Sequence, residues 1–187
     1  MPIDHHYHRD ERVIVHLALM LCVVVGVLAI VLSQTVGNHT EPVSPDEVWS
    51  YIEEQASRQG IDPEFVYAIA WAESSLNARA RSSVARGMMQ ITRPAWREVS
   101  DESYRHAWDW RTNVRVGIDY LAFCRDYLKQ HGEFTYPLLA AAYRYGPYHV
   151  KKSDFKISEM EPPENLIYES IFNGHTNPVE PPALNSD

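Results

Sequence analysis

The chain has 187 residues, of which 45% are apolar and 22% charged, with eight glycines, twelve prolines and two cysteines. These values exclude a mainly disordered protein, a collagen-like fibre and a disulfide-dense scaffold, and they fit one ordinary domain with extra segments. The formal net charge of −8 argues against a nucleic-acid-binding protein. The charge is uneven, however. Residues 78–156 carry fourteen basic and eight acidic side chains, which predicts a negatively charged partner for this central stretch.

Near the N-terminus, an apolar run of 20 residues extends from Val13 to Leu32, and only His16 and Gly26 interrupt it. At about 1.5 Å per residue, a helix of this length spans ~30 Å, one bilayer core. A secretory signal core is usually shorter and is followed by an Ala-x-Ala pattern, which is missing here. We therefore interpret residues 13–33 as an uncleaved transmembrane signal anchor, with a cleaved signal peptide as the alternative.

The orientation of this anchor follows from the distribution of Lys and Arg. Arg9 and Arg12 precede the span, and no Lys or Arg follows it until Arg58. The positive-inside rule then predicts that residues 1–12 form a cytoplasmic tail. The rest of the chain is expected on the outer, periplasmic side of the cytoplasmic (inner) membrane, joined to the anchor by a polar linker at residues 34–43.

Helix signals begin directly after this linker. Ser44-Pro45-Asp46-Glu47 has the form of a capping box with proline at the first helical position, and Gly60 ends that helix. Asp62-Pro63-Glu64 then opens a second helix, which runs toward Leu76.

A third helix is predicted from about Thr112 to the residue before Gly132. Its apolar positions recur at intervals of three or four residues, at Val114, Ile118, Leu121, Cys124 and Leu128. The cysteine in this stripe is therefore expected in the core rather than in a redox or nucleophilic role. Shorter helices are predicted over Tyr136–Arg144 and Glu164–Asn173.

No stretch shows the period-two alternation of a strand, so we expect an all-α (mainly α) fold. The folded domain is predicted over residues 44–174 and is preceded by the single transmembrane helix. Residues 175–187 contain three prolines and are predicted to form a disordered tail.

Glu73 is the first candidate for chemistry, because eight residues without a charge precede it in the second helix. Apolar neighbours would desolvate its carboxyl group, and the nearby helix C-terminus disfavours negative charge. Both effects raise the pKa of the carboxyl, as a general acid requires near neutral pH. The alternative is an ordinary surface glutamate on the polar face of the helix.

Five motifs follow one another in order at compatible spacing. They are Glu73-Ser74, Gly87-Met88-Met89-Gln90, Asn113-Val114-Arg115-Val116-Gly117, Ala141-Ala142-Tyr143-Arg144-Tyr145-Gly146-Pro147 and Glu164-Asn165-Leu166-Ile167-Tyr168. Over about residues 60–172 the chain thereby resembles the soluble lytic transglycosylase (SLT) domain family. The resemblance implies a lysozyme-like helical domain that cleaves the glycan strands of peptidoglycan.

The resemblance also implies roles for individual residues. Glu73 matches the single catalytic acid/base of the family. Ser82, Gln90, Tyr143 and Glu164 match residues expected to bind substrate. Gln90 could instead brace the catalytic helix, and a structural role is the alternative for Glu164.

The chain departs from the family pattern beside the expected sugar site. Arg144 and Tyr145 stand where the family has Asn and Ala, and Met88 stands where it has Leu. Because Arg cannot accept a hydrogen bond, anything that the Asn accepted is lost. These departures keep open a non-catalytic peptidoglycan-binding or scaffolding module, for example in a secretion or other envelope machine.

The resemblance implies a reaction without metal or cofactor, in which Glu73 acts as acid and then as base. The product would be a 1,6-anhydro-N-acetylmuramic acid end. A lysozyme-like hydrolase that uses water is the alternative, and it would usually require a second carboxylate. Local sequence offers none, although folding could bring one close from Glu98, Asp101, Glu102 or Asp109.

Overall fold

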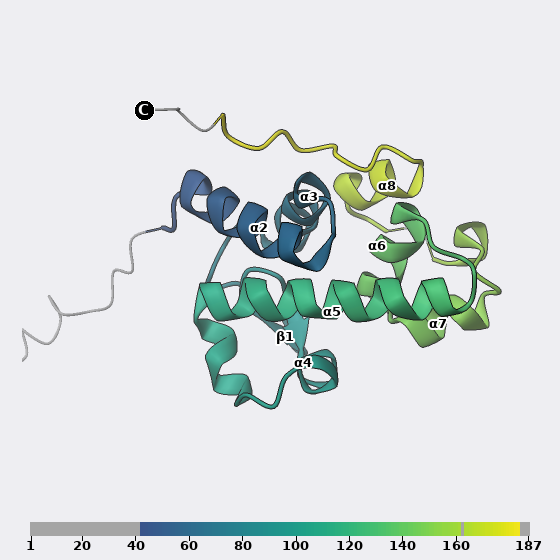
Figure 1. Cartoon of the computed structure of the whole chain (residues 1–187), viewed down its shortest axis with the longest axis horizontal. Coiled ribbons are helices and arrows are strands. Elements are labelled where there is room, and N and C mark those ends of the chain that lie inside the picture. Colours follow the sequence, from purple (N-terminus) through teal and green to yellow (C-terminus); the bar gives the residue numbers. More distant parts are fainter. Residues whose placement is uncertain (1–41, 162, 184–187) are drawn as a thin grey trace, which may run out of the picture. The chain divides into compact units, whose positions relative to one another are not determined.

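The computed structural model describes residues 42–161 and 163–183. Within them the chain forms seven α-helices, two short 3-10 helices and one two-stranded hairpin, labelled as in Figure 1. In chain order the elements are α2 (Pro45–Gln59), α3 (Pro63–Ser74), β1 (Ala85–Arg86), β2 (Ile91–Thr92), α4 (Arg93–Val99), η1 (Tyr104–Trp108), α5 (Trp110–Gln130), α6 (Tyr136–Tyr145), α7 (Pro147–Lys152), η2 (Ile157–Glu159) and α8 (Leu166–Phe172).

Helix α2 begins and ends where its capping residues predict. The hydroxyl oxygen of Ser44 accepts a hydrogen bond from the backbone N–H of Glu47 at 3.2 Å. The Glu47 carboxylate pairs with Arg111 of α5, so its partner is an arginine rather than the N-cap backbone of a full capping box. Gly60 has φ +64°, a left-handed conformation that ends the helix at little steric cost.

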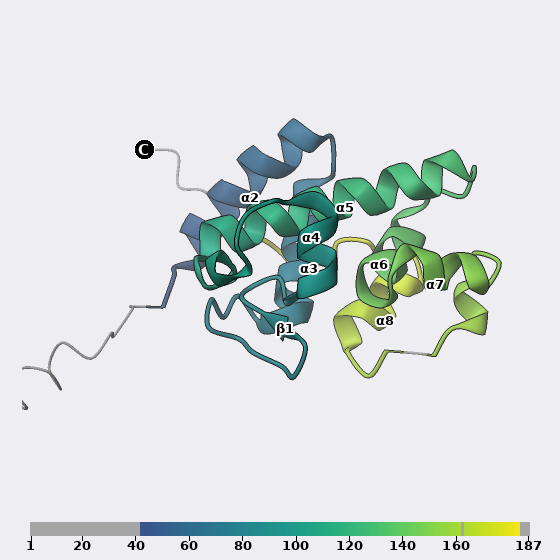
Figure 2. The same ribbon diagram turned by 90° about the horizontal axis from the view of Figure 1, so that it is seen from below.

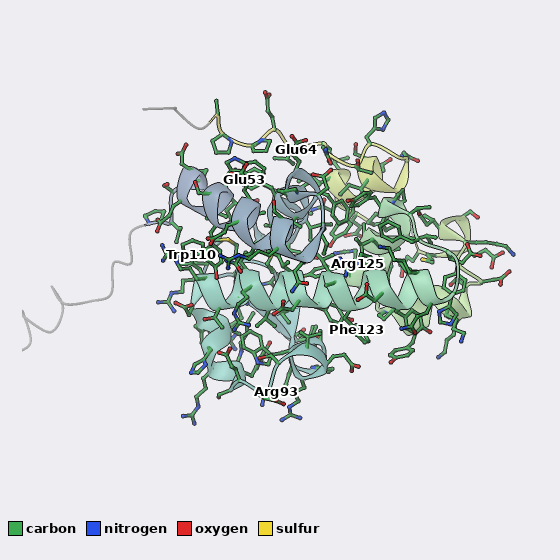
Figure 3. The ribbon with its side chains drawn as sticks, viewed as in Figure 1. Glu53, Glu64, Arg93, Trp110, Phe123 and Arg125 are labelled. Atoms are coloured by element: carbon green, nitrogen blue, oxygen red, sulfur yellow. The ribbon has the colours of Figure 1, made fainter. Side chains whose placement is uncertain are left out.

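Helix α5 is the long central element, and α2, α4 and α6 all pack against it (Figure 1). It begins at Trp110, two residues before the predicted start, because Asp109 accepts a hydrogen bond from the backbone N–H of Thr112 at 2.8 Å. Toward α2, the half-buried Arg125 donates to the carbonyl of Gln59 (Figure 3). The predicted apolar stripe is confirmed, with its cysteine, as fully or nearly fully buried residues: Val114, Ile118, Leu121, Cys124 and Leu128.

A small antiparallel hairpin, which the sequence analysis did not predict, lies beside α3. Ala85 pairs with Thr92 and Arg86 pairs with Ile91. Each strand has only two residues, too few for an alternating pattern to be visible in the sequence.

Buried Asn113 of α5 holds this hairpin against the core. Its side-chain oxygen accepts from the backbone N–H of Met89 at 2.7 Å, and its amide donates to the carbonyls of Arg86 at 3.0 Å and Ala107 at 3.1 Å. Gly87 has φ +79°, and a Cβ atom there would lie 2.3 Å from the Asn113 amide nitrogen. Only glycine therefore allows this close approach.

The remaining short elements differ in part from the prediction. Helix α6 extends one residue beyond the predicted end at Arg144. Helix α8 begins two residues after the predicted start at Glu164, because Asn165 caps it and accepts from the backbone N–H groups of Ile167 and Tyr168. Helices α4 and α7 and the two 3-10 helices were not predicted, since their short lengths leave no clear periodicity.

At the N-terminus the structure describes the chain only from residue 42 on, and at the C-terminus it describes the chain up to residue 183. The predicted cytoplasmic tail, the predicted anchor and nearly all of the predicted linker lie outside the described residues. Within residues 42–161 and 163–183, no helix is both long and apolar enough to cross a membrane. Residues 175–183 form neither helix nor strand, but Asn177 donates to Glu64 at 2.7 Å and Val179 packs against the core. This part of the expected disordered tail therefore contacts the domain.

Candidate active site

Helix α3 carries Glu73 close to its C-terminal end. The helix starts at Pro63, behind Asp62, whose side chain accepts from the backbone N–H of Glu64 at 3.0 Å. Its middle is fully buried from Phe65 to Ala70, so its direction is fixed by packing. Its last residues emerge from the core only partly, and Glu73 is half-buried there.

The carboxyl group of Glu73 has one direct side-chain partner among the described residues. The hydroxyl group of Tyr168, on α8, donates to Glu73 Oε1 at 2.5 Å. The same helix is tied to α3 a second time, because the side-chain amide of Asn165 donates to the carbonyl of Ala72 at 3.1 Å. Helix α8 therefore fixes both the backbone and the carboxyl group at this end of α3.

Three influences decide the protonation of Glu73. Burial is the largest, and it raises the pKa of this carboxyl above its ordinary value. The hydrogen bond from Tyr168 and the positive charge of Arg144 both lower the pKa, but they do not cancel the effect of burial. Glu73 therefore holds its proton to a higher pH than an exposed glutamate, as predicted from the apolar sequence before it.

Glu73 faces a cavity of about 420 Å³ between the hairpin loop and helix α6. In Figure 2 the loop that carries β1 lies on one side of α3, and α6 and α8 lie on the other. The residues that line the cavity are Glu73, Ser82, Val84, Ala85, Gln90, Ile91, Thr92, Ala95, Tyr120, Tyr143, Arg144, Tyr145 and Gly146. Four of the five site residues predicted from the sequence are among them.

Ser82 and Gln90 stand on the hairpin side of this cavity. The Ser82 hydroxyl oxygen accepts from the backbone N–H groups of Val84 and Ala85, at 3.3 and 3.0 Å, which shapes the loop and leaves its proton available as a donor. The Gln90 amide donates to the carbonyl of Gly87 at 2.9 Å. This hydrogen bond lies within the loop and does not reach helix α3, and Gln90 also lines the cavity.

Tyr143 lines the cavity, but its hydroxyl group has a structural partner. It donates to the carbonyl of Met89 at 2.8 Å, and burial raises its pKa well above the ordinary value, so it stays protonated. Ser74 donates to the neighbouring carbonyl of Met88 at 2.7 Å. Two helices, α3 and α6, thus hold the same loop segment by adjacent carbonyls.

Glu164 does not join the other predicted residues. Its side chain is exposed and does not line the cavity. The residues of this motif that contact α3 lie one and four positions later, at Asn165 and Tyr168. The sequence did not predict the hydrogen bond between Tyr168 and Glu73. Tyr168 lies 95 residues after Glu73, and in its motif only Glu164 was considered as a site residue.

Glu73 is the one carboxylate that lines the cavity among the described residues. The four acids considered as partners lie elsewhere. Asp109 caps α5, Glu102 pairs with Arg115, and Glu98 and Asp101 are exposed.

Arg144, singled out as a departure from the family pattern, does reach the cavity.

Comparison with known proteins places the chain in a family. The family model described as "Transglycosylase SLT domain" matches residues 50–162, which include most of the site. The chain belongs to this SLT-domain family.

Solved structures are also similar. One of them is an inactive mutant of the lytic transglycosylase Slt from Pseudomonas aeruginosa, with 23% identity, a TM-score of 0.49 and a match over 68% of this chain. The match covers only 21% of that longer chain.

Proposed function

We propose that this SLT domain is a peptidoglycan lytic transglycosylase, which cleaves the β-1,4 bond between N-acetylmuramic acid and N-acetylglucosamine. The observation that carries the proposal is the state of Glu73. It is a half-buried carboxyl group with a raised pKa, held by Tyr168 at a cavity where no second carboxylate of the described residues stands. Membership of the SLT-domain family supports the same substrate.

In the first step, protonated Glu73 gives its proton to the glycosidic oxygen. The bond between this oxygen and the anomeric carbon breaks, and the leaving sugar departs with a hydroxyl group. The N-acetyl group of the muramic acid residue stabilises the positive charge that develops on that carbon. Glu73 is now an anion, and the hydroxyl group of Tyr168 and the charge of Arg144 both favour that form.

In the second step, the C6 hydroxyl group of the same muramic acid residue attacks the anomeric carbon. Glu73 takes the proton of this hydroxyl group, which restores the starting state. No water is consumed, and the product carries a 1,6-anhydro ring. One carboxyl group that alternates between acid and base is enough for both steps.

A hydrolase is less well supported. Ordinary glycosidases place a second carboxylate about 5–5.5 Å or ~6.5–9.5 Å from the acid, where it acts as the nucleophile or activates water. The lining residues of the cavity offer no such group opposite Glu73. A purely non-catalytic module rests only on the departures at Arg144 and Tyr145, and these leave Glu73 in place at the cavity.

We also propose that the domain works outside the cytoplasmic membrane and is held there by residues 13–33. The support is the sequence itself, namely the apolar run of bilayer length and the two arginines that precede it. Peptidoglycan lies on that side of the membrane, so the location fits the proposed substrate.

Replacement of Glu73 by Gln tests the proposal. Gln keeps the size of the side chain and can still accept from Tyr168, but it cannot deliver a proton. General acid–base catalysis typically supplies ~10²–10⁴-fold in rate. We therefore expect the rate at which fragments are released from purified sacculi to fall by ~10²-fold or more. The matched control is Glu64→Gln at the opposite, exposed end of α3 (Figure 3), which should leave the rate unchanged. Near wild-type turnover of Glu73→Gln would contradict the proposal.

A further inference from the structure

Arg144 is an exposed side chain of α6 that lines the same cavity as Glu73. Its guanidinium carbon lies 4.9 Å from the centre of the Tyr168 ring and 5.8 Å from the centre of the Tyr145 ring. Contacts of a guanidinium with aromatic faces are attractive and limit its freedom. Arg144 is therefore a positioned cation at the edge of the site.

Within residues 42–161 and 163–183, this cation forms no ion pair. The arginines of α5 do have partners, since Arg111 pairs with Glu47 and Arg115 with Glu102. Glu73 is the one described acid that lines the cavity, and burial favours its neutral, protonated form. Before cleavage the cavity would then hold a positive charge without a counter-ion.

We propose that Arg144 binds a carboxylate group of the peptidoglycan strand and so makes the enzyme selective for strands that carry one near the cleaved bond. This inference rests on the proposed function. A guanidinium group presents a planar fork of donors that matches a carboxylate, and such charge-assisted pairs are about twice as strong as neutral hydrogen bonds. The departure from the Asn of the family pattern would thus replace a hydrogen-bond acceptor by an anion-binding group.

The strand offers this carboxylate from two sources. In strands stripped of their peptides, the lactyl group of N-acetylmuramic acid ends in a free carboxylate. In intact strands that group is used in an amide bond, and the free carboxylates belong to the stem peptide. Both sources present the same chemistry to Arg144, so they are separated by experiment.

The test compares the full chain with Arg144→Ala and Arg144→Lys on three substrates. These are peptide-bearing strands, strands stripped by an amidase, and peptide-bearing strands whose carboxylates have been converted to amides. We expect Arg144→Ala to lose roughly tenfold more in kcat/KM on a carboxylate-bearing substrate than on the amidated one, where only the common effect on Glu73 is left. Arg144→Lys should recover part of the loss, because it keeps the charge but not the fork. Lys152→Ala, which removes an exposed charge from α7, is the matched control and should show no substrate-dependent loss.

Removing Arg144 also removes a charge that lowers the pKa of Glu73. That change is common to every substrate at a given pH, so the ratio of rates between substrates isolates the carboxylate contact. A second measurement is independent of turnover. Inactive Glu73→Gln should co-sediment with intact sacculi more than with amidated sacculi, and Glu73→Gln/Arg144→Ala should lose this preference.

The outcomes separate the inference from the proposed function. A loss confined to stripped strands assigns the lactyl carboxylate, and a loss confined to peptide-bearing strands assigns the stem peptide. An equal loss on all three substrates, together with equal sedimentation, overturns the inference while the enzyme still cleaves. A wild-type chain that cleaves none of the strands overturns the proposed function itself.

Discussion

At the scale of single residues, burial and the groups near Glu73 have opposite effects on the pKa of its carboxyl group. Glu73 lies in a partly buried position near a helix C-terminus, where its anionic form is unfavourable. The hydroxyl group of Tyr168 and the charge of Arg144 counteract this penalty in part. A group that must both give and receive a proton needs both tendencies, because neither protonation state can then become too stable.

Removal of the Tyr168 hydroxyl group should move the pH dependence of activity. Tyr168→Phe deletes the hydrogen bond that lowers the pKa of Glu73, while the burial that raises this pKa remains. The pKa should rise, and the alkaline limb of the kcat/KM profile should move to higher pH, since the general acid stays protonated longer. Profiles of rate against pH on soluble glycan strands measure this.

The matched control for this prediction is Tyr148→Phe. Tyr148 is 59% exposed and does not line the cavity, so its loss should leave the profile in place. An alkaline limb that stays fixed, or moves to lower pH, in Tyr168→Phe would mean that the hydrogen bond does not control the proton of Glu73.

Glu73→Gln should also change how stability depends on pH. The pKa of Glu73 is raised in the folded state, so the folded chain holds its proton more tightly than the unfolded chain does. This contribution is fully present below the unfolded pKa and is lost as pH rises through the folded pKa. Relative to wild type, Glu73→Gln should therefore become more stable as pH rises from acid to neutral, as seen in melting temperatures. A constant difference across that range would contradict the raised pKa.

At the residue level, local motifs indicated which side chains lie near Glu73, while their roles in binding substrate stay predictions. The apolar run before Glu73 indicated a desolvated carboxyl, and Ser82, Gln90 and Tyr143 do line its cavity. Tyr168 was not predicted, and Glu164 does not line the cavity, because Glu164 lies before α8 begins at Leu166 whereas Tyr168 lies within that helix and reaches Glu73. The sequence also could not indicate that the Tyr143 hydroxyl group is used to hold Met89.

At the scale of elements, the loop between β1 and β2 links the core to the site. Asn113 holds it from α5, while Ser74 and Tyr143 hold the carbonyls of Met88 and Met89 from the two helices that flank the cavity. Gly117 lets α5 approach the same loop, because a Cβ atom there would lie 2.8 Å from the Met89 side chain. Packing of the core therefore sets the position of one wall of the cavity.

Asn113→Ala should destabilise the fold and disturb this wall together. The change leaves the backbone N–H of Met89 and the carbonyls of Arg86 and Ala107 without their partner. A buried polar group left unsatisfied costs about 1–3 kcal/mol, so we expect a loss of at least ~2 kcal/mol in the free energy of unfolding. Denaturant titration measures it.

Asn177→Ala provides the comparison for this prediction. Asn177 also hydrogen-bonds through its side chain, but to exposed Glu64 at the surface, so its loss should cost well under ~1 kcal/mol. Equal stability losses in the two variants would show that Asn113 is not the anchor of the loop.

Among the elements, those with strong local signals were predictable. Capping residues and a regular apolar stripe define α2, α3 and α5 to within two residues. The hairpin and the shortest helices are held by long-range contacts such as those of Asn113, which no local pattern reports. The site is built partly from these elements, which explains why its shape could not be predicted in full.

At the scale of the whole molecule, the uneven charge of the sequence can be compared with the position of the cavity. The chain is acidic in total, with a net charge of −8, but residues 78–156 are basic and supply every residue that lines the cavity except Glu73, with Arg144 as the basic residue among them. Long-range attraction to a carboxylate-bearing polymer is the expected consequence, and it should weaken with added salt. The anchor proposed for residues 13–33 would keep this surface close to the membrane side of such a polymer.

The chemistry of the released sugar end tests the central claim most directly. With Glu73 as the one carboxylate at the described cavity, the nucleophile is expected to be the substrate's own C6 hydroxyl group. Sacculi are digested with the full chain, and the released muropeptides are weighed by mass spectrometry before and after borohydride reduction, with a lysozyme digest alongside. We predict fragments lighter by one water than the lysozyme products and unchanged by borohydride. Mainly reducible N-acetylmuramic acid ends would mean that water had attacked, and would contradict the lytic transglycosylase assignment.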